Sequence, residues 1–350
     1  HFPIMAKRTE PPSVSWDEPY HGAAVHRSEH RAASWVWKGA DGPAIQCVPP
    51  HRSDMAEWQN NLYGEIRSAG KLVPKQRGCN YRTYSGGFAA CGEIEWKETL
   101  PMGEGEEGYT VARHFIAAAA LPDDRTMIVL EHAVMLKDSM LAEVKSLGLK
   151  MPNDIFNGGN RRCRGESTDL ALSGIPHCNE TIPIDSPWLS IDDELSIIRI
   201  YGGERFNIFR PNERRIAICR PTQPILGSIY ADEICLICAI GNNFYPEGAV
   251  LFDNGFAVST VASSDAKRMT GKMQQIQCDT LGMRGARVAG YDGAVYLFIA
   301  NFGEDTHARL PIEGSGIIDL AAGTHYPITG GIVDVTCAKG NSAVYTIEGA

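Results

Sequence analysis

The sequence predicts an all-β fold in which a large antiparallel β-sandwich is followed by a small C-terminal β-sandwich. The chain has 36 Gly and 20 Pro residues, and they are spread along its length instead of being gathered into a linker. Short runs between these turn residues alternate apolar and polar side chains or are rich in β-branched and aromatic residues, which is typical of strands. Parallel βαβ units would need a helical pattern of about 10–15 residues after each strand, and such patterns are absent. Stacked antiparallel sheets are therefore favoured.

The expected strands follow one another along most of the chain. The clearest runs are 34–38, 81–96, 109–121, 126–136, 195–201, 214–220, 229–240, 250–261, 294–300, 332–337 and 343–347.

One hairpin can be predicted in register. The run 111–121 leads into a Pro-Asp-Asp-Arg segment with the chemistry of a tight turn, and 126–136 returns. Pairing of residue 121 with residue 126 places His114 opposite Ala133 and puts Glu131 on the same face as His114. Four consecutive alanines at 117–120 indicate a central strand that bulky neighbours cover on both faces.

Two short helices are predicted, and the second one marks a domain boundary. The first covers 54–63, where a strand is nearly as good an interpretation. The second covers 264–275, with Ser264 as its N-cap. We therefore expect an N-terminal extension at 1–22, a large β-sandwich at 23–263, a helical connector at 264–283 and a small β-sandwich at 284–350.

Composition narrows the class of function. The 33 Lys and Arg residues face 42 Asp and Glu residues, and this net charge of −9 argues against binding to nucleic acid or to anionic membranes. No apolar run approaches the roughly 20 residues of a membrane-spanning helix. The chain begins at His1 with no basic start and no apolar h-region, so we expect no signal peptide. Because it also lacks an initiator Met, we expect a processed or excised piece of a longer protein.

The ten cysteines form no disulfide framework, and we expect buried, reduced thiols and a cytoplasmic location. Cys235 and Cys238 make a CxxC inside an expected strand at 233–240. Residues three apart on a strand point to opposite faces, which is poor geometry for a shared zinc ion. We expect no bound metal and no cofactor.

The last sixty-odd residues resemble the small C-terminal β-sandwich of many bacterial carbohydrate-active enzymes. The resemblance is carried by a hairpin that turns at Asp292-Gly293 and leads into Tyr-Leu-Phe-Ile-Ala-Asn-Phe, by Asp-Leu-Ala-Ala-Gly at 319–323, and by a final Val-Tyr-Thr-Ile at 344–347. It covers under a fifth of the chain, and its motifs indicate architecture more than substrate.

The segment 23–263 is similar to the broad β-sandwich that accompanies a catalytic barrel or toroid in glycoside hydrolases and heparinase-type polysaccharide lyases. The similar segments are Ala24-Val-His-Arg27, 113–124, 151–157 and 188–193. The long helical series of a toroid and the βα repeat of a barrel are both absent. The resemblance therefore implies the β part of such an enzyme, with an oligo- or polysaccharide as ligand and an N-terminal catalytic domain as missing partner. This part would shape a substrate cleft or hold a homo-oligomer together.

Two alternatives stay open beside that hypothesis. The chain is a complete lyase or hydrolase on a sheet scaffold, or it is a non-catalytic carbohydrate-binding module. For the complete enzyme, His114 and Glu131 are the candidate catalytic pair, because a His–Glu pair can act as a general base with its orienting group. The alternative for this pair is a buried His satisfied by a carboxylate.

The polar stretch 151–166 is the candidate substrate-binding loop. Its side chains offer amides, carboxylates and guanidinium groups suited to sugars, and the arginines suit an acidic sugar. Asn, Asp and Gly are also ordinary turn residues. The candidate residues are Asn153, Asp154, Asn157, Arg161 and Arg162.

Trp35 and Trp37 would point to one face of a strand, where they could stack on a sugar ring or fill the core between two sheets. His26 and His30 would make a metal site only on a helix, and a polar loop is the alternative. Paired carboxylates are offered by Asp192, Asp193 and Glu194 and by Glu93 and Glu95, but a sequence gives no separation between them.

Overall fold

A computed structural model describes residues 13–39, 43–56, 61–68, 72–98, 108–153, 160–212, 216–217 and 228–349. Within these residues the regular structure is nearly all β-strand, and every pair of named strands is antiparallel. The described part contains one α-helix, α1 (Ser263–Thr270), and one 3-10 helix, η1 (Ser53–Met55). The predicted all-β class is confirmed. None of the described helices is long and apolar enough to cross a bilayer.

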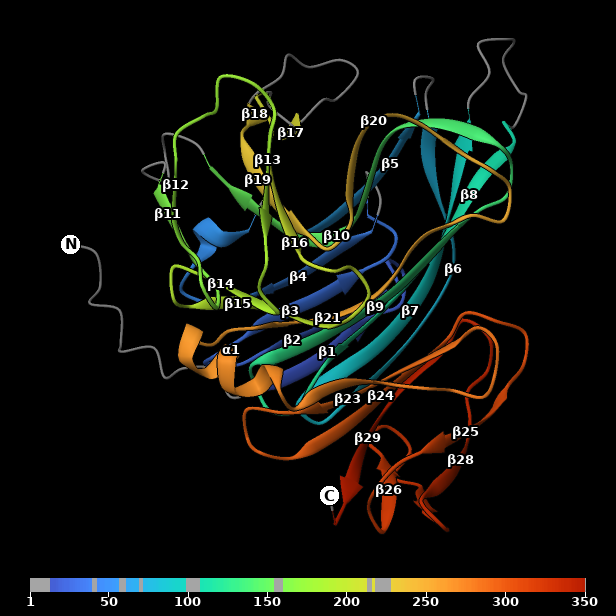
Figure 1. Cartoon of the computed structure of the whole chain (residues 1–350). Helices are drawn as coiled ribbons and strands as arrows, with labels where there is room; N and C mark the ends of the chain where they lie inside the picture. Colours follow the sequence, from blue (N-terminus) through green and yellow to red (C-terminus); the bar gives the residue numbers. More distant parts are fainter. Residues whose placement is uncertain are drawn as a thin grey trace, which may run out of the picture.

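Two large sheets stack face to face (Figure 1). The first has the strand order β1 (Val14–Glu18), β2 (Ala23–Arg27), β3 (Ala32–Val36), β4 (Ala44–Val48), β5 (Leu62–Ser68), β10 (Ser139–Pro152), β19 (Ala231–Cys235), β16 (Phe206–Arg210) and β13 (Glu180–Ile184), and β20 (Cys238–Tyr245) also pairs with β10. The second has the order β12 (Asp169–Ser173), β11 (Asn160–Arg164), β14 (Trp188–Ile191), β15 (Leu195–Tyr201), β21 (Val250–Ser259), β9 (Thr126–Met135), β8 (Thr110–Ala120), β7 (Gly87–Glu98) and β6 (Leu72–Tyr84).

A smaller unit at the C-terminal end, orange to red in Figure 1, lies below the large sandwich. One sheet has the order β22 (Met273–Ile276), β23 (Met283–Ala289), β24 (Val295–Asn301), β29 (Ser342–Glu348), β26 (Gly316–Asp319) and β27 (His325–Pro327), and β25 (His307–Pro311) pairs with β28 (Ile332–Thr336). Apolar side chains of β24 and β29 pack against those of β25 and β28, so this unit is a sandwich with its own core. A further short pair joins β17 (Ile216–Ala217) to β18 (Ser228–Ile229).

The alanines of β8 lie between two apolar layers, as their run predicted. Ala118 and Ala120 contribute to the core between the large sheets, and Ala117 and Ala119 contribute to the core that joins the second sheet to the C-terminal unit. Successive side chains of a strand point to opposite faces, so small residues allow close packing on both. The predicted register is also confirmed, because His114 lies opposite Ala133.

Trp35 and Trp37 are core residues. Their rings stack with centroids 5.1 Å apart and an interplanar angle of 4°. Their exposed fractions are 0% and 1%, so neither ring offers a face to a ligand. Gly92 on β7 explains how Trp37 fits, because a Cβ at that position would lie 2.5 Å from the indole. Because both indoles are buried, neither has an exposed face on which a sugar ring could stack.

Both predicted helices need correction. Among the described residues of the first region, only a 3-10 turn at 53–55 is helical, and β5 begins at Leu62, while 57–60 lie outside the described residues. The second helix is shorter than expected, because β22 begins at Met273. Its N-cap is Ala262, not Ser264, and the Ser263 amide donates instead to Asp193 Oδ1 at 2.8 Å.

Two strand predictions also differ from the structure, and one long strand was missed. The run 81–96 is a hairpin of β6 and β7, and the run 229–240 is interrupted between β19 and β20. The long strand β10 was not predicted, although it pairs with β5, β19 and β20. The residues assigned to the N-terminal extension contain a strand, β1, which pairs with β2 of the first large sheet. The domain boundaries themselves stay predictions.

Candidate functional site

His114 and Glu131 form the predicted pair, but in the interior. His114 Nε2 lies 3.1 Å from Glu131 Oε2, and the two residues are 2% and 0% exposed. The carboxylate also accepts from the Leu147 amide at 3.0 Å and from Asn254 Nδ2 at 3.2 Å, while the imidazole packs edge-on against the Phe252 ring at 5.0 Å. The carboxylate is thus satisfied between the sheets, which is the arrangement of the structural alternative, while His114 Nδ1 is buried without a hydrogen-bond partner. The catalytic role of the pair stays a prediction.

The candidate substrate-binding loop is only partly described. Asp154 and Asn157 lie outside the described residues. Asn153 is buried, and its Nδ2 donates to Asp232 Oδ2 at 2.9 Å and to the Gly174 carbonyl at 3.0 Å. Burial is the main reason that the pKa of Asp232 rises to about 6. Asn153 therefore joins the end of β10 to β19 and to the residue that follows β12.

The two arginines of this loop make different contacts. Arg161 is buried, and its Nη1 donates to Asp54 Oδ2 at 2.7 Å and to Asp192 Oδ2 at 2.9 Å. Arg162 is exposed and donates from Nε to Asp169 Oδ1 at 2.6 Å. Both guanidinium groups are paired with carboxylates, and they border an open hollow of about 580 Å³. Their role in binding a ligand stays a prediction.

A larger polar cleft of about 1050 Å³ lies at one end of the large sandwich, and we call it the end cleft. Its walls come from turns of both sheets: the β2–β3 turn, the segment after β4, the β8–β9 turn, the β14–β15 turn and the segment from β21 into α1. The side chains and backbone that line it belong to Arg27, Ser28, Glu29, His30, Pro49, Pro50, His51, Arg125, Asp193, Glu194, Thr260, Val261, Ala262 and Asp265. It therefore gathers acidic and basic groups, two of them imidazoles.

His51 and Glu194 make the shortest polar contact among the cleft side chains. His51 Nε2 lies 2.6 Å from Glu194 Oε2, and their side chains are 69% and 36% exposed. Arg52 binds the other oxygen of Glu194 and also donates to Asp192 Oδ2 at 2.8 Å. The carboxylate is thus held in place by a guanidinium group while it orients an exposed imidazole. This arrangement can position a proton donor or acceptor at the mouth of the cleft.

The β14–β15 turn places the acidic wall of the cleft. Asp192 and Asp193 have φ of 52° and 62°, the left-handed pair that a two-residue type I′ hairpin turn needs. Asp193 Oδ1 accepts from the Ser263 amide at the start of α1, and these hydrogen bonds lower the pKa of Asp193. Hydrogen bonds from Arg52 outweigh burial and hold the pKa of Asp54 far below its ordinary value. These carboxylates are therefore anionic near neutral pH.

A buried ion pair lies beside two of the turns that line the cleft, since Arg31 follows His30 and Asp123 lies two residues before Arg125. Arg31 and Asp123 are buried, with 3.6 Å between Nη1 and Oδ1. Arg31 Nη1 donates to the Thr126 carbonyl at 2.5 Å, and its Nη2 lies 2.9 Å from His26 Nδ1. Burial, reinforced by the Arg31 charge, lowers the pKa of His26 to about 4. His26 is thus a neutral structural residue on a strand, not half of a helical metal site.

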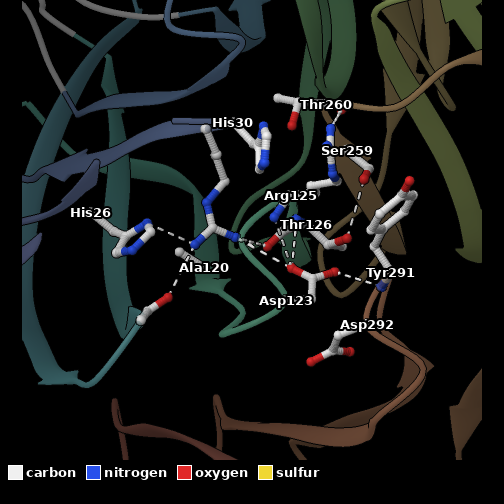
Figure 2. A network of polar contacts seen from close by, with 12 residues as sticks. His26, His30, Ala120, Asp123, Arg125, Thr126, Ser259, Thr260, Tyr291 and Asp292 are labelled. Carbon is white, nitrogen blue, oxygen red and sulfur yellow. Dashed lines mark hydrogen bonds and ion pairs between the residues drawn. The ribbon is translucent and has the colours of Figure 1, made fainter. Parts of the chain in front are cut away.

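Asp123 connects the β8–β9 turn to neighbouring segments (Figure 2). Its Oδ1 accepts from the Thr126 amide at 2.8 Å and the Arg125 amide at 3.0 Å, and its Oδ2 accepts from the Tyr291 amide at 2.9 Å. The Arg125 guanidinium then lies 4.5 Å from the centre of the Tyr291 ring and donates to the Thr260 carbonyl at 2.9 Å. The cleft wall at Arg125 is therefore rigidly placed against the C-terminal unit.

Sequence reasoning singled out Asp193, Glu194 and His30 but did not place them in one site, and it missed His51 and Arg125. The sequence could have indicated these residues only by their places in the chain, because each of them lies at a strand end or in a turn. Among the described residues, no group of three or more His, Cys, Asp or Glu side chains has the arrangement of a metal site.

No protein-family model matches the chain, and no curated protein matches it. Solved structures similar to it include the galactosidase domain of the alpha-galactosidase-sucrose kinase AgaSK, with a TM-score of 0.43 and 6% identity over 72% of this chain and 42% of that chain. The GH36 alpha-galactosidase AgaB from Geobacillus stearothermophilus gives 0.43 and 6% over 73% and 42%. The alpha-galactosidase from Lactobacillus brevis gives 0.43 and 9% over 71% and 41%. The match thus spans less than half of each enzyme, and a likeness this distant assigns no activity to the chain.

Proposed function

We propose that this chain is the β-sheet part of a carbohydrate-active enzyme and that its end cleft binds a segment of an acidic saccharide. The observation that carries the proposal is the end cleft itself, in which turns of both sheets bring carboxylates, imidazoles and guanidinium groups together. Catalysis would need the further domain that the sequence resemblance implies. The end cleft would then form one wall of a shared substrate site.

The chemistry of the cleft suits a saccharide better than an apolar ligand. Sugar hydroxyls both donate and accept hydrogen bonds, so they match a wall that carries Glu29 and Asp265 beside His30. Arg27 and Arg125 add guanidinium groups, which bind carboxylates through paired hydrogen bonds. The guanidinium groups would hold the carboxylate of a uronic-acid saccharide, while the wall carboxylates would accept from its hydroxyls.

Calorimetric titration of the purified chain with uronic-acid oligosaccharides and with neutral gluco- and galacto-oligosaccharides tests the proposal. We expect the acidic series to bind and Arg27→Gln to weaken binding about tenfold or more, because a hydrogen bond to a charged group contributes about 1.5–3 kcal/mol. Arg309→Gln is the matched control, since Arg309 lies on β25 of the C-terminal unit. Binding of no saccharide, or equal effects of both variants, would contradict the proposal.

The second candidate function is a complete lyase or hydrolase, and the contact between His51 and Glu194 favours it. A carboxylate-oriented imidazole at the mouth of an open cleft is placed to exchange a proton with a bound ligand. Turnover of an oligosaccharide by the isolated chain, lost in His51→Gln while binding persists, would support this candidate. Binding without turnover would leave the chain as a wall of a larger site.

A further inference from the structure

Cys235 and Cys238 lie at the break between β19 and β20. A continuous strand would place their side chains on opposite faces. Instead, Leu236 and Ile237 interrupt the strand, and a hydrogen bond between the Cys235 and Cys238 thiols contributes to the pKa shifts of both. The interruption therefore brings together two thiols that the sequence pattern separates.

The break is fixed by specific hydrogen bonds. The Ile237 amide donates to Ser146 Oγ at 3.1 Å, and the Ser146 amide donates to the Ile237 carbonyl at 3.1 Å. Asn207 Nδ2 donates to the Leu236 carbonyl at 3.1 Å. Both residues between the cysteines are thus held by neighbouring strands, so the two thiols are held near each other by the fold.

The two cysteines differ in exposure. Cys235 ends a strand whose residues are all buried, and it is 2% exposed. Cys238 begins β20, which is mostly exposed, and its own side chain is partly accessible. A solvent-borne reagent can therefore reach Cys238 first.

Charge and hydrogen bonding make Cys238 the more acidic thiol. The hydrogen bond from Cys235 lowers the pKa of Cys238, and the Lys145 ammonium group lowers it further, against the opposing effects of burial and of Glu233 and Glu143. Donation of the same hydrogen bond, together with burial, raises the pKa of Cys235. Lys145 lies opposite Cys238 in the pairing of β10 with β20. An accessible, more acidic thiol beside a buried partner is the usual arrangement of an attacking and a resolving cysteine.

We propose that Cys235 and Cys238 form a thiol–disulfide exchange site that takes small-molecule disulfides. The Cys238 thiolate attacks one sulfur of the disulfide, which forms a mixed disulfide and releases the first small thiolate. Cys235 then loses its proton to solvent, and its thiolate attacks the Cys238 sulfur. That step forms the internal disulfide and releases the second small thiolate, so the two cysteines are oxidised and the added disulfide is reduced to two thiols.

Other thiols of the chain lack this arrangement. Burial raises the pKa of Cys47 and of Cys163 to about 12, so neither can serve as the attacking thiol near neutral pH. Cys178 is exposed, and no thiol contact holds a second cysteine beside it in the described structure. It is expected to form only a mixed disulfide, which makes it an internal reference. The inference is independent of saccharide binding.

The test treats the native chain with oxidised glutathione near neutral pH, traps free thiols by alkylation in acid, and cleaves after Glu. Cleavage after Glu233 and Glu247 releases both cysteines in one peptide without any other cysteine. We expect this peptide to lose two hydrogens in mass and to escape alkylation, while Cys178 gains glutathione. A peptide that is fully alkylated while Cys178 is glutathionylated would overturn the proposal.

Two variants test the assigned order of attack. Cys235→Ser should leave Cys238 as a stable glutathione adduct, and Cys238→Ser should leave Cys235 unmodified. Adducts on Cys235 in the second variant at the rate seen for Cys178 would contradict the proposed order. Circular dichroism of each variant verifies the fold, and the wild-type peptide map remains decisive if a variant fails to fold.

Discussion

Replacing Arg31 by Met tests whether the buried ion pair of Arg31 and Asp123 stabilises the fold. Met keeps much of the side-chain volume but removes the charge that faces Asp123 at 3.6 Å and the donor that reaches the Thr126 carbonyl at 2.5 Å. Removing one partner of a buried pair costs about 3–5 kcal/mol, because the other charge stays buried without compensation. At about 2–4 °C per kcal/mol, the Tm should fall by roughly 6–20 °C.

Arg309→Met is the control for that substitution. Arg309 lies 3.6 Å from Asp334, but these side chains are 63% and 83% exposed. Exposed pairs contribute about 0–1 kcal/mol, so the Tm should fall by less than about 4 °C. Differential scanning calorimetry of both variants beside the wild type makes the comparison. Equal and small losses of Tm would refute the assignment of a structural role to the buried pair.

Two further predictions concern packing and pH. Gly92→Ala should destabilise the protein by about 1–3 kcal/mol, because the new Cβ would lie 2.5 Å from the Trp37 ring. Gly78→Ala is the control, because open space surrounds that position and stability should change by less than about 0.5 kcal/mol. Urea unfolding compares the two variants, and a smaller loss of stability for Gly92→Ala than for Gly78→Ala would contradict the packing. The pKa of His26 is about 4 in the folded protein, against an ordinary value of 6.5 in the unfolded chain. The unfolded chain therefore gains its proton first, and stability should fall as the pH falls from 6.5 to about 4. His26→Gln should reduce this loss in Tm measured across that range, and an unchanged pH profile would argue against a neutral, buried His26.

Sequence alone predicted the hairpin of β8 and β9 because its determinants are local. A Pro-Asp-Asp turn sets the pairing, and a run of alanines can be placed only where both faces are crowded. The close pair of His114 and Glu131 followed from that register. Their enclosure between two sheets depends on Phe252 and other residues distant in the chain, so it could not be read from the hairpin.

The strand β10 escaped prediction because its sequence carries charges that are buried only in the folded protein. Lys145 is 1% exposed, and it lies 2.7 Å from Glu143 Oε1 and also contacts Glu233. A Lys and a Glu two residues apart look like a solvated segment until strands from other parts of the chain supply the partners. The break at Leu236 and Ile237 also depends on a distant part of the chain, since the Ile237 amide donates to Ser146 Oγ of β10.

The end cleft could not be predicted because no single segment contains it. Its walls come from five turns, and the tertiary pairing of the two sheets decides which strand ends meet. The sequence indicated Asp193 and Glu194 as carboxylates but gave no neighbour for them. His51 acquires a role only through its contact with Glu194, which is 143 residues away.

Hydrogen–deuterium exchange of the chain with and without a uronic-acid oligosaccharide tests the central claim most directly. The account predicts that bound saccharide slows amide exchange in the turns that form the end cleft, at 28–31, 49–52, 122–125, 192–194 and 260–265, and leaves β25 and β28 unchanged. Protection confined to the C-terminal unit, or none at a saturating concentration, would contradict the assignment of the end cleft as a saccharide site.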